Sequence, residues 1–142
     1  MKKVVIINGP NLNLLGIREK SIYGSHSFEN FLSELSGKYP EIELVYKQSN
    51  IEGEIINYLH EHGFSAVGII INPGGYSHTS VSIADAIKAI QSPVIEVHIS
   101  NIHAREEYRH RSLTGSACLG VISGLGLKGY ELALNHLMNN EI

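Results

Sequence analysis

Two short apolar runs decide the fold of this 142-residue chain: Val-Val-Ile-Ile at 4–7 and Ala-Val-Gly-Ile-Ile-Ile at 66–71. Both are rich in β-branched residues and neither alternates with polar positions. This pattern is typical of strands that are buried on both faces of a parallel sheet. Three further apolar runs are shorter or include a polar residue; they are 42–46, 94–97 and, more weakly, 120–122. The chain therefore contains five candidate strands.

Segments with helical periodicity separate these runs. Their apolar side chains recur at three- and four-residue spacing, in 28–35, 51–59, 81–90 and 132–138. Ser27 is a candidate N-cap for the first helix, Gly63 ends the second, and Pro93 stops the third. The order predicts an α/β fold, a five-stranded parallel sheet with helices on both faces and right-handed crossovers. At this length we expect a single domain, residues 1–142.

Composition excludes several classes of protein. The 11 Lys and Arg residues against 14 Asp and Glu residues give a net charge of −3, whereas nucleic-acid-binding domains usually carry a basic excess. A single cysteine, Cys118, excludes a disulfide framework. The apolar run at 4–7 ends at Asn8-Gly9-Pro10, too early for a signal peptide or a membrane span. We therefore expect no nucleic-acid partner, no membrane association and a cytoplasmic location.

Polar residues gather where the candidate strands end. Ligands of open parallel α/β sheets bind beyond the carboxyl ends of the strands. Three stretches at these ends are rich in Asn, His, Ser and Gly: Asn8 to Asn11, Asn72 to Ser80, and His98 to Asn101. The connections at the opposite edge, such as 39–41 and 62–64, have the composition of ordinary turns. The site is therefore predicted at the carboxyl edge.

The segment from about 9 to 25 shows no periodicity and contains two arginine or lysine residues and Tyr23. A βα loop of this length in a compact domain is usually functional or disordered, and we interpret it as a lid over the site. Tyr23 has packing within the loop as its alternative role. Arg18 and Arg109 have the alternative role of solvated surface charges.

The polar candidates in the strands also have structural alternatives. Asn72 has the alternative role of bracing a turn, and His98 that of a strand-end histidine bonded to a carbonyl. Glu96 lies inside the fourth candidate strand, and a buried carboxylate needs a partner. Because residues two apart on a strand share a face, the sequence predicts that Glu96 orients His98.

Two patterns imitate cofactor or metal signatures. Residues 124–129 match the dinucleotide fingerprint, but the 13 residues that follow are too few for a βαβ unit, so we expect a tight turn into the last helix. The series His98, His103 and His110 has no further ligand at a compact spacing. We therefore expect neither a metal nor a cofactor.

Together, the loop motifs resemble one known family, the type II 3-dehydroquinate dehydratases of the shikimate pathway. The matching stretches are Asn8 to Leu12, Gly16 to Glu19, Tyr23-Gly24, Asn72 to Ser80, Glu96 to Asn101 and His103 to Arg109. The resemblance covers nearly the whole chain. It implies a flavodoxin-like five-stranded sheet. It also implies a hydro-lyase that converts 3-dehydroquinate to 3-dehydroshikimate through an enolate.

The resemblance also implies roles for the reacting groups. Tyr23 is the base that removes a proton beside the ketone, and the charge of Arg18 favours its tyrosinate form. Asn11 holds a water on the enolate oxygen. His98 is the general acid that protonates the leaving hydroxyl, and Glu96 supports it.

Further positions resemble substrate contacts of the family. The backbone N–H groups of Ile99 and Ser100 match those that hold the substrate carboxylate. The family's other substrate contacts fall on Asn72, His78 and Arg109. Asp85 matches a residue supplied by a neighbouring subunit, in a family that typically forms dodecamers built from trimers.

The chain departs from the family pattern just after Arg109. The family pattern is His-His-Ser-Tyr, and this chain has His110-Arg111-Ser112-Leu113. Because these residues follow the site motifs, we expect them to affect helix packing or a subunit contact rather than the chemistry.

Two other functions compete with this interpretation. A flavodoxin-like module that binds flavin or acts as a receiver is one, although the sequence at 8–11 has no Ser/Thr-rich phosphate loop and 48–50 has no acidic cluster. An imine-forming dehydratase is the other. Only three lysines, Lys20, Lys47 and Lys128, come near the predicted site edge.

Overall fold

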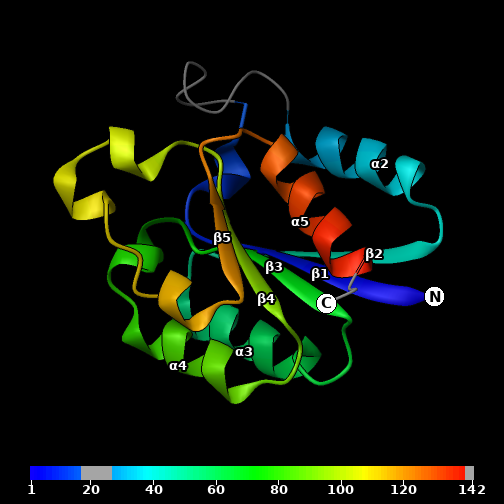
Figure 1. Cartoon of the computed structure of the whole chain (residues 1–142), viewed down its shortest axis with the longest axis horizontal. Coiled ribbons are helices and arrows are strands. Elements are labelled where there is room, and N and C mark those ends of the chain that lie inside the picture. The colour runs from blue at the N-terminus through cyan, green and yellow to red at the C-terminus, as the bar shows by residue number, and fades with distance from the viewer. Residues whose placement is uncertain (17–26, 140–142) are drawn as a thin grey trace.

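Five parallel strands form one sheet within residues 1–16 and 27–139, the part of the chain that the structure, a computed structural model, describes (Figure 1). The strands are β1 (Lys2–Asn8), β2 (Ile42–Gln48), β3 (Gly68–Asn72), β4 (Val94–His98) and β5 (Gly120–Ser123). Their spatial order is β2-β1-β3-β4-β5, the flavodoxin-like order. The predicted α/β class and parallel sheet are confirmed.

Helices cover both faces of the sheet. They are α2 (Phe28–Lys38), α3 (Glu52–His62), α4 (Val81–Ala89) and α5 (Lys128–Met138). The helices α2 and α5 lie on one face, and α3 and α4 lie on the other (Figure 1). No helix in the described ranges is both apolar enough and long enough to cross a membrane.

The run at 4–7 shows why the two internal faces need no polar positions. Val4 and Ile6 pack into the cluster under α2 and α5, and Val5 and Ile7 pack into the cluster under α3 and α4. All four side chains are fully buried. Because the strand pleat sends alternate side chains to opposite faces, a strand covered on both sides is apolar at every position.

Local signals fix the helix ends. The Ser27 hydroxyl accepts the Asn30 N–H at 3.2 Å, which confirms the predicted cap of α2. Ser80 caps α4 in the same way, at 2.9 Å from the Ile83 nitrogen. The helix α3 ends at Gly63 as expected.

The long polar segment after β1 is described only to Gly16. It contains the short 3-10 helix η1 (Leu12–Leu14), followed by the buried Leu15. The rest of the predicted lid, with Arg18 and Tyr23, lies outside the described residues.

The connection from β4 to β5 contains three short 3-10 helices: η3 (Ile102–Ala104), η4 (Glu107–Arg109) and η5 (Gly115–Ala117). Another, η2 (Gly74–His78), follows β3. Residues 110–113 therefore lie in an irregular turn between η4 and η5.

Candidate active site

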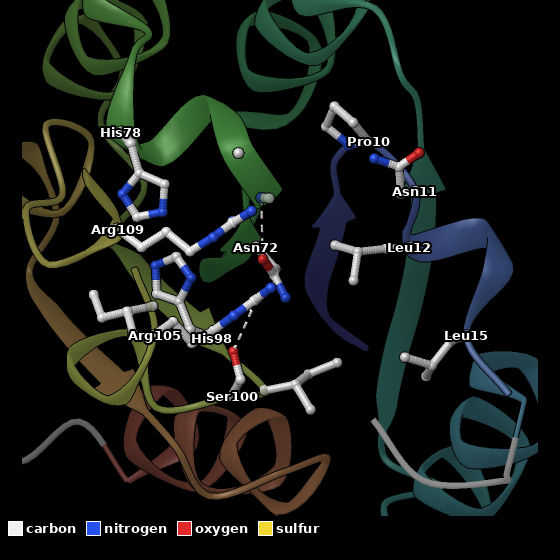
Figure 2. A pocket seen from close by; sticks show the side chains of 14 residues that line it. Pro10, Asn11, Leu12, Leu15, Asn72, His78, His98, Ser100, Arg105 and Arg109 are labelled. Atoms are coloured by element: carbon white, nitrogen blue, oxygen red, sulfur yellow. Dashed lines mark hydrogen bonds between the residues drawn. The ribbon is translucent and has the colours of Figure 1, made fainter. Parts of the chain in front are cut away.

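A cavity of about 140 Å³ opens at the carboxyl ends of β1, β3 and β4 (Figure 2). Its lining residues are Pro10, Asn11, Leu12, Leu15, Asn72, Gly74, Gly75, His78, His98, Ile99, Ser100, Ile102, Arg105 and Arg109. The predicted edge of the sheet is thus the edge that carries the pocket. Parallel strands bring their carboxyl ends together, so segments far apart in sequence line one cavity.

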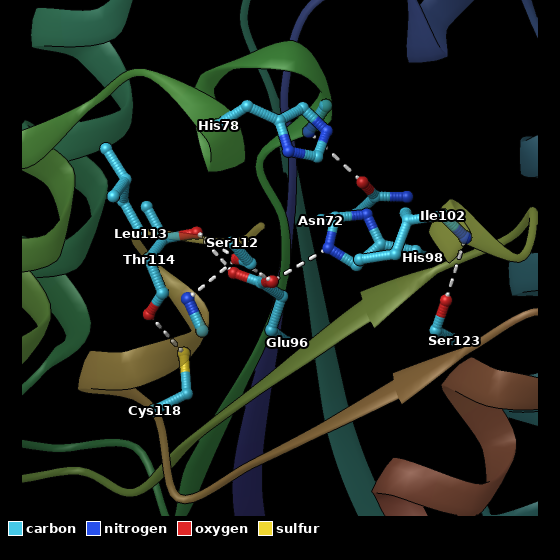
Figure 3. A network of polar contacts seen from close by, with 12 residues as sticks. Asn72, His78, Glu96, His98, Ile102, Ser112, Leu113, Thr114, Cys118 and Ser123 are labelled. Carbon is cyan, nitrogen blue, oxygen red and sulfur yellow. Dashed lines mark hydrogen bonds and ion pairs between the residues drawn. The ribbon is translucent and has the colours of Figure 1, made fainter. Parts of the chain in front are cut away.

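The predicted pair of Glu96 and His98 exists. His98 Nε2 donates to Glu96 Oε2 at 2.7 Å, and both side chains are buried (Figure 3). Both belong to β4 and share the face that α3 and α4 cover, because they are two residues apart. The ring of His98 lines the pocket, whereas the carboxylate of Glu96 lies behind it. Glu96 therefore contacts His98 from outside the cavity.

Two hydroxyl groups complete the surroundings of Glu96. Ser112 Oγ donates to Glu96 Oε2 at 2.5 Å, and Thr114 Oγ1 donates to Oε1. Burial by itself raises the pKa of this carboxyl group. The hydrogen bonds and the charge of His98, together with the two hydroxyls, outweigh burial and hold the pKa of Glu96 below its ordinary value.

The segment after Arg109 contacts the site directly. The carbonyl of Arg111 binds His78 Nδ1 at 2.8 Å, and the ring of His78 stacks on that of His98 with centroids 6.3 Å apart. These residues were expected to affect helix packing or a subunit contact, and the structure also brings Ser112 and the Arg111 carbonyl against two residues of the site. A hydroxyl placed 16 residues after a strand carboxylate gives no local signal, since only the turn brings Ser112 back to Glu96.

Asn72 braces a turn, the structural role considered for it, and it also lines the pocket. Its Oδ1 accepts the Gly74 N–H at 3.1 Å and braces the turn, and its Nδ2 donates to the Tyr130 hydroxyl at 3.0 Å. Tyr130 in turn donates to Asn8 Oδ1 at 2.8 Å. This buried chain of polar groups ties β1, β3 and α5 together beneath a pocket that Asn72 also lines.

The glycine-rich segment after β5 is the predicted tight turn, and it also braces the pocket wall. Its Gly124 and Gly126 nitrogens donate to the carbonyls of His98 and Ile99, at 3.1 and 3.0 Å. Ser123 Oγ donates to the Ser100 carbonyl at 3.3 Å. Gly124 has a φ of 89°, a conformation that favours glycine. These bonds fix the backbone whose N–H groups were predicted to hold a carboxylate.

Two arginines line the pocket. Arg109, a predicted contact, donates from Nε to Glu106 Oε2 at 2.7 Å. Arg105 was not predicted as a site residue; its Nη1 donates to Ser100 Oγ at 3.4 Å. Arg105 belongs to the motif His103 to Arg109, and its place in that motif is a sequence signal that could have marked it as a site residue.

The remaining predicted residues are more dispersed. Asn11 lines the pocket, has a φ of 70° and donates its backbone N–H to Asn50 Oδ1 at 3.0 Å. Asp85 is exposed on α4 and does not line the pocket. Arg18 and Tyr23 lie outside the described residues.

The histidine series does not converge. The rings of His103 and His110 lie 5.8 Å apart. Within residues 1–16 and 27–139, no group of three His, Cys, Asp or Glu side chains could hold a metal ion.

Comparison with known proteins bears on this pocket. Residues 2–138 match the family model described as Dehydroquinase class II. The chain is 61% identical over 137 residues to a 3-dehydroquinate dehydratase from Caldicellulosiruptor bescii, with 94% of each chain covered. It is 54% identical over 141 residues to one from Clostridium perfringens, with 97% of each covered.

Solved structures agree. The type II dehydroquinase from Butyrivibrio crossotus superposes with a TM-score of 0.91 at 48% identity, covering 97% of this chain and 98% of that one. The type II dehydroquinase from Propionibacterium acnes gives 0.92 at 41% identity, with 96% of each covered.

Proposed function

The chain belongs to the class II dehydroquinase family, and from this premise we propose that it dehydrates 3-dehydroquinate to 3-dehydroshikimate through an enolate, as a hydro-lyase of the shikimate pathway. The observation that carries the proposal is the hydrogen-bonded pair of Glu96 and His98 at the wall of the pocket. Loss of a hydroxyl group requires a proton, and an imidazole beside a buried carboxylate is suited to deliver it.

His98 is proposed as the general acid. Its Nε2 is bonded to Glu96, so Nδ1 is the nitrogen that remains for the substrate. The low pKa of Glu96 keeps the carboxylate charged, so a negative charge lies 2.7 Å from the Nε2 atom of His98. The imidazolium gives its proton to the leaving hydroxyl, which departs as water, and the electrons of the enolate form the new double bond.

The enolate itself requires a base. We assign this role to Tyr23, with Arg18 favouring its tyrosinate and Asn11 holding a water on the enolate oxygen. The family motifs support Tyr23 and Arg18. The place of Asn11 in the pocket lining supports its assignment.

Substrate binding is assigned to groups at the end of β3 and in the segments that follow β3 and β4. The N–H groups of Ile99 and Ser100 are proposed to hold the carboxylate, and Asn72, His78 and Arg109 to bind hydroxyls. All five residues line the cavity. The turn at 123–126 supports the first assignment, because it fixes the backbone of this segment.

Assembly is proposed to complete the site. Asp85 is exposed on α4, away from its own pocket, in agreement with a role in the site of a neighbouring subunit. We propose that the chain forms a homododecamer built from trimers and that it is located in the cytoplasm. Sedimentation should give a mass several-fold above 15.6 kDa. A fully active monomer would remove Asp85 from the site.

One assay tests the function. Addition of 3-dehydroquinate to the purified protein should produce the absorbance of the conjugated enone. His98→Ala should greatly slow this reaction, and His60→Ala, on the exposed surface of α3, should not. A protein that forms no enone and carries a flavin spectrum would restore the binding-module alternative.

A further inference from the structure

The carboxylate of Glu96 is surrounded by more donors than its role toward His98 requires. Its side chain is fully buried. Oε2 accepts from His98 Nε2 at 2.7 Å and from Ser112 Oγ at 2.5 Å, and Oε1 accepts from Thr114 Oγ1 (Figure 3). Each oxygen therefore has a fixed donor, and the carboxylate cannot rotate without losing hydrogen bonds in a buried place.

The hydroxyl of Ser112 has its direction set by the turn. Its oxygen accepts the Gly115 N–H at 2.9 Å, so its proton is directed to Glu96. The turn is also packed tightly. A Cβ on Gly115 would lie 3.1 Å from Glu96 Oε2 and 3.0 Å from Ser112 Oγ.

Backbone hydrogen bonds also anchor the same turn to η2, which carries His78 beside His98. The N–H groups of Leu113 and Thr114 donate to the Ser77 carbonyl at 2.7 and 3.4 Å, and the Arg111 carbonyl binds His78. Thr114 is fully buried. The two hydroxyls therefore stand on a segment tied to η2, not on a loose loop.

We propose that Ser112 and Thr114 are positioning residues for the dehydration: they hold Glu96 as a fixed, ionised acceptor and, through it, keep the ring of His98 oriented with Nδ1 toward the substrate. The proposal rests on the proposed function of His98 and adds two residues that do not line the cavity.

The charges around Glu96 make the effect measurable. The titratable groups near it are His98 on the same strand, His78 stacked on His98 from η2, and Cys118 beyond η5. Burial, with the nearby charge of Glu96, raises the pKa of the Cys118 thiol to about 12, so it stays neutral. The residues paired with Glu96 on β3 and β5 are the apolar Ile71 and Val121.

Removal of a hydroxyl donor should therefore shift the pKa of Glu96 in one direction. Burial of Glu96 is then opposed by fewer hydrogen bonds, and its pKa rises. When the Glu96 carboxylate becomes protonated, it no longer holds the ring of His98 as firmly. In the variants this loss should occur at a higher pH than in the wild type. The acid limb of the plot of kcat against pH should move by about one unit toward higher pH. The value of kcat should fall about tenfold, with a smaller change in KM.

The experiment compares Thr114→Val, Ser112→Ala and Thr114→Ser with Ser116→Ala. Thr114→Val keeps the shape and deletes the donor, and Thr114→Ser restores the donor. Ser116 is the matched control, because its hydroxyl is exposed and donates to the Leu113 carbonyl, at 2.7 Å, rather than to Glu96. Titration of the Glu96 carboxyl carbon by NMR, assigned with Glu96→Gln, provides a readout that needs no substrate.

We expect a raised Glu96 midpoint and acid limb in Thr114→Val and Ser112→Ala, wild-type values in Ser116→Ala, and recovery in Thr114→Ser. An unchanged Glu96 midpoint in both folded donor variants would overturn the proposal. Should Thr114→Val not fold, Ser112→Ala decides alone. If the wild-type protein forms no enone while the midpoints shift, the proposed function has failed and the placement of the carboxylate has not.

Discussion

Two buried histidines lie at opposite ends of the sheet, and their surroundings have opposite charge. His98, at the carboxyl end, is 6% exposed and pairs with Glu96 at 2.7 Å. His62, at the end of α3 near the amino ends of the strands, is 8% exposed and accepts a hydrogen bond from the Lys3 ammonium at 3.2 Å. The two rings are thus buried to a similar extent, but His98 has a carboxylate as its hydrogen-bond partner and His62 has an ammonium group.

The partner decides what each ring can do. A lysine ammonium can only donate, so Nδ1 of His62 is unprotonated and its proton stays on Nε2. Burial and the charge of Lys3 lower the pKa of His62, despite the carboxylate of Glu61 3.8 Å from Nε2. His62 is therefore a neutral packing group, whereas His98 is held by a hydrogen bond to a carboxylate.

The largest expected effect separates the proposed base from the proposed acid. His98→Ala should slow dehydration by roughly 10²–10⁴-fold, because the hydroxyl then departs without its acid. Tyr23→Phe should abolish both dehydration and exchange of the hydrogen beside the ketone, because no base remains. In deuterium oxide, NMR of recovered 3-dehydroquinate should show label in the His98→Ala reaction and none with Tyr23→Phe.

Exchange at the wild-type rate in Tyr23→Phe would assign the base to another residue. His62→Ala is the matched control for His98→Ala, since it truncates an equally buried ring at the other end of the sheet. Its activity per folded molecule should stay at the wild-type level. A comparable loss of activity there would contradict the contrast between the two histidines.

The next effect concerns the polar groups beneath the pocket. Tyr130→Phe deletes the buried hydroxyl between Asn8 and Asn72 and should lower the free energy of unfolding by about 1–3 kcal/mol, because two amides lose a partner. Urea unfolding measures it. Tyr58→Phe, on half-buried α3 surface away from the pocket, should change stability by less than about 0.5 kcal/mol. Equal losses of stability in the two variants would show that the hydrogen bonds among Asn8, Asn72 and Tyr130 do not stabilise the fold.

A smaller effect should appear at the amino end as a dependence on pH. The folded pKa of His62 lies below the ordinary value of 6.5, so the unfolded chain binds its proton first as pH falls. Stability should therefore decline as pH drops from about 6.5 toward that lower pKa. His62→Gln should flatten this part of the stability curve. His60→Gln, exposed on the same helix, should leave the slope intact.

The last prediction is that removal of metal ions and small molecules has no effect on activity. The proposed chemistry uses side chains and one water, so extended chelation and dialysis should leave the rate of enone formation unchanged. A loss of activity that a divalent ion restores would show that the histidines at the carboxyl end serve a metal after all.

Much of the architecture could be predicted because its signals are local. Unalternated β-branched runs mark strands covered on both faces, and the cap at Ser27 and the stop at Gly63 depend only on neighbouring residues. The pairing of Glu96 with His98 was predictable for the same reason, since a spacing of two places both on one face of a strand.

The contacts that complete the site could not be predicted in this way. Ser112 and Thr114 reach Glu96 only because the irregular β4–β5 connection returns over the strand end. Arg111 and His78 come from separate loops and meet through a backbone carbonyl, which carries no side-chain signal. Such contacts depend on where two loops are placed by the whole sheet.

The sequence by itself determined the layers, the functional edge and the Glu96–His98 pair, because strand period and strand direction are properties of short segments. Only the tertiary structure decided which buried histidine lies beside a carboxylate and which beside an ammonium. It also decided which hydroxyls reach the carboxylate and that the glycine turn at 124–126 braces the pocket wall. The physical reason is that electrostatic partners are chosen by distance in space, and distance in space is set by packing of the entire chain.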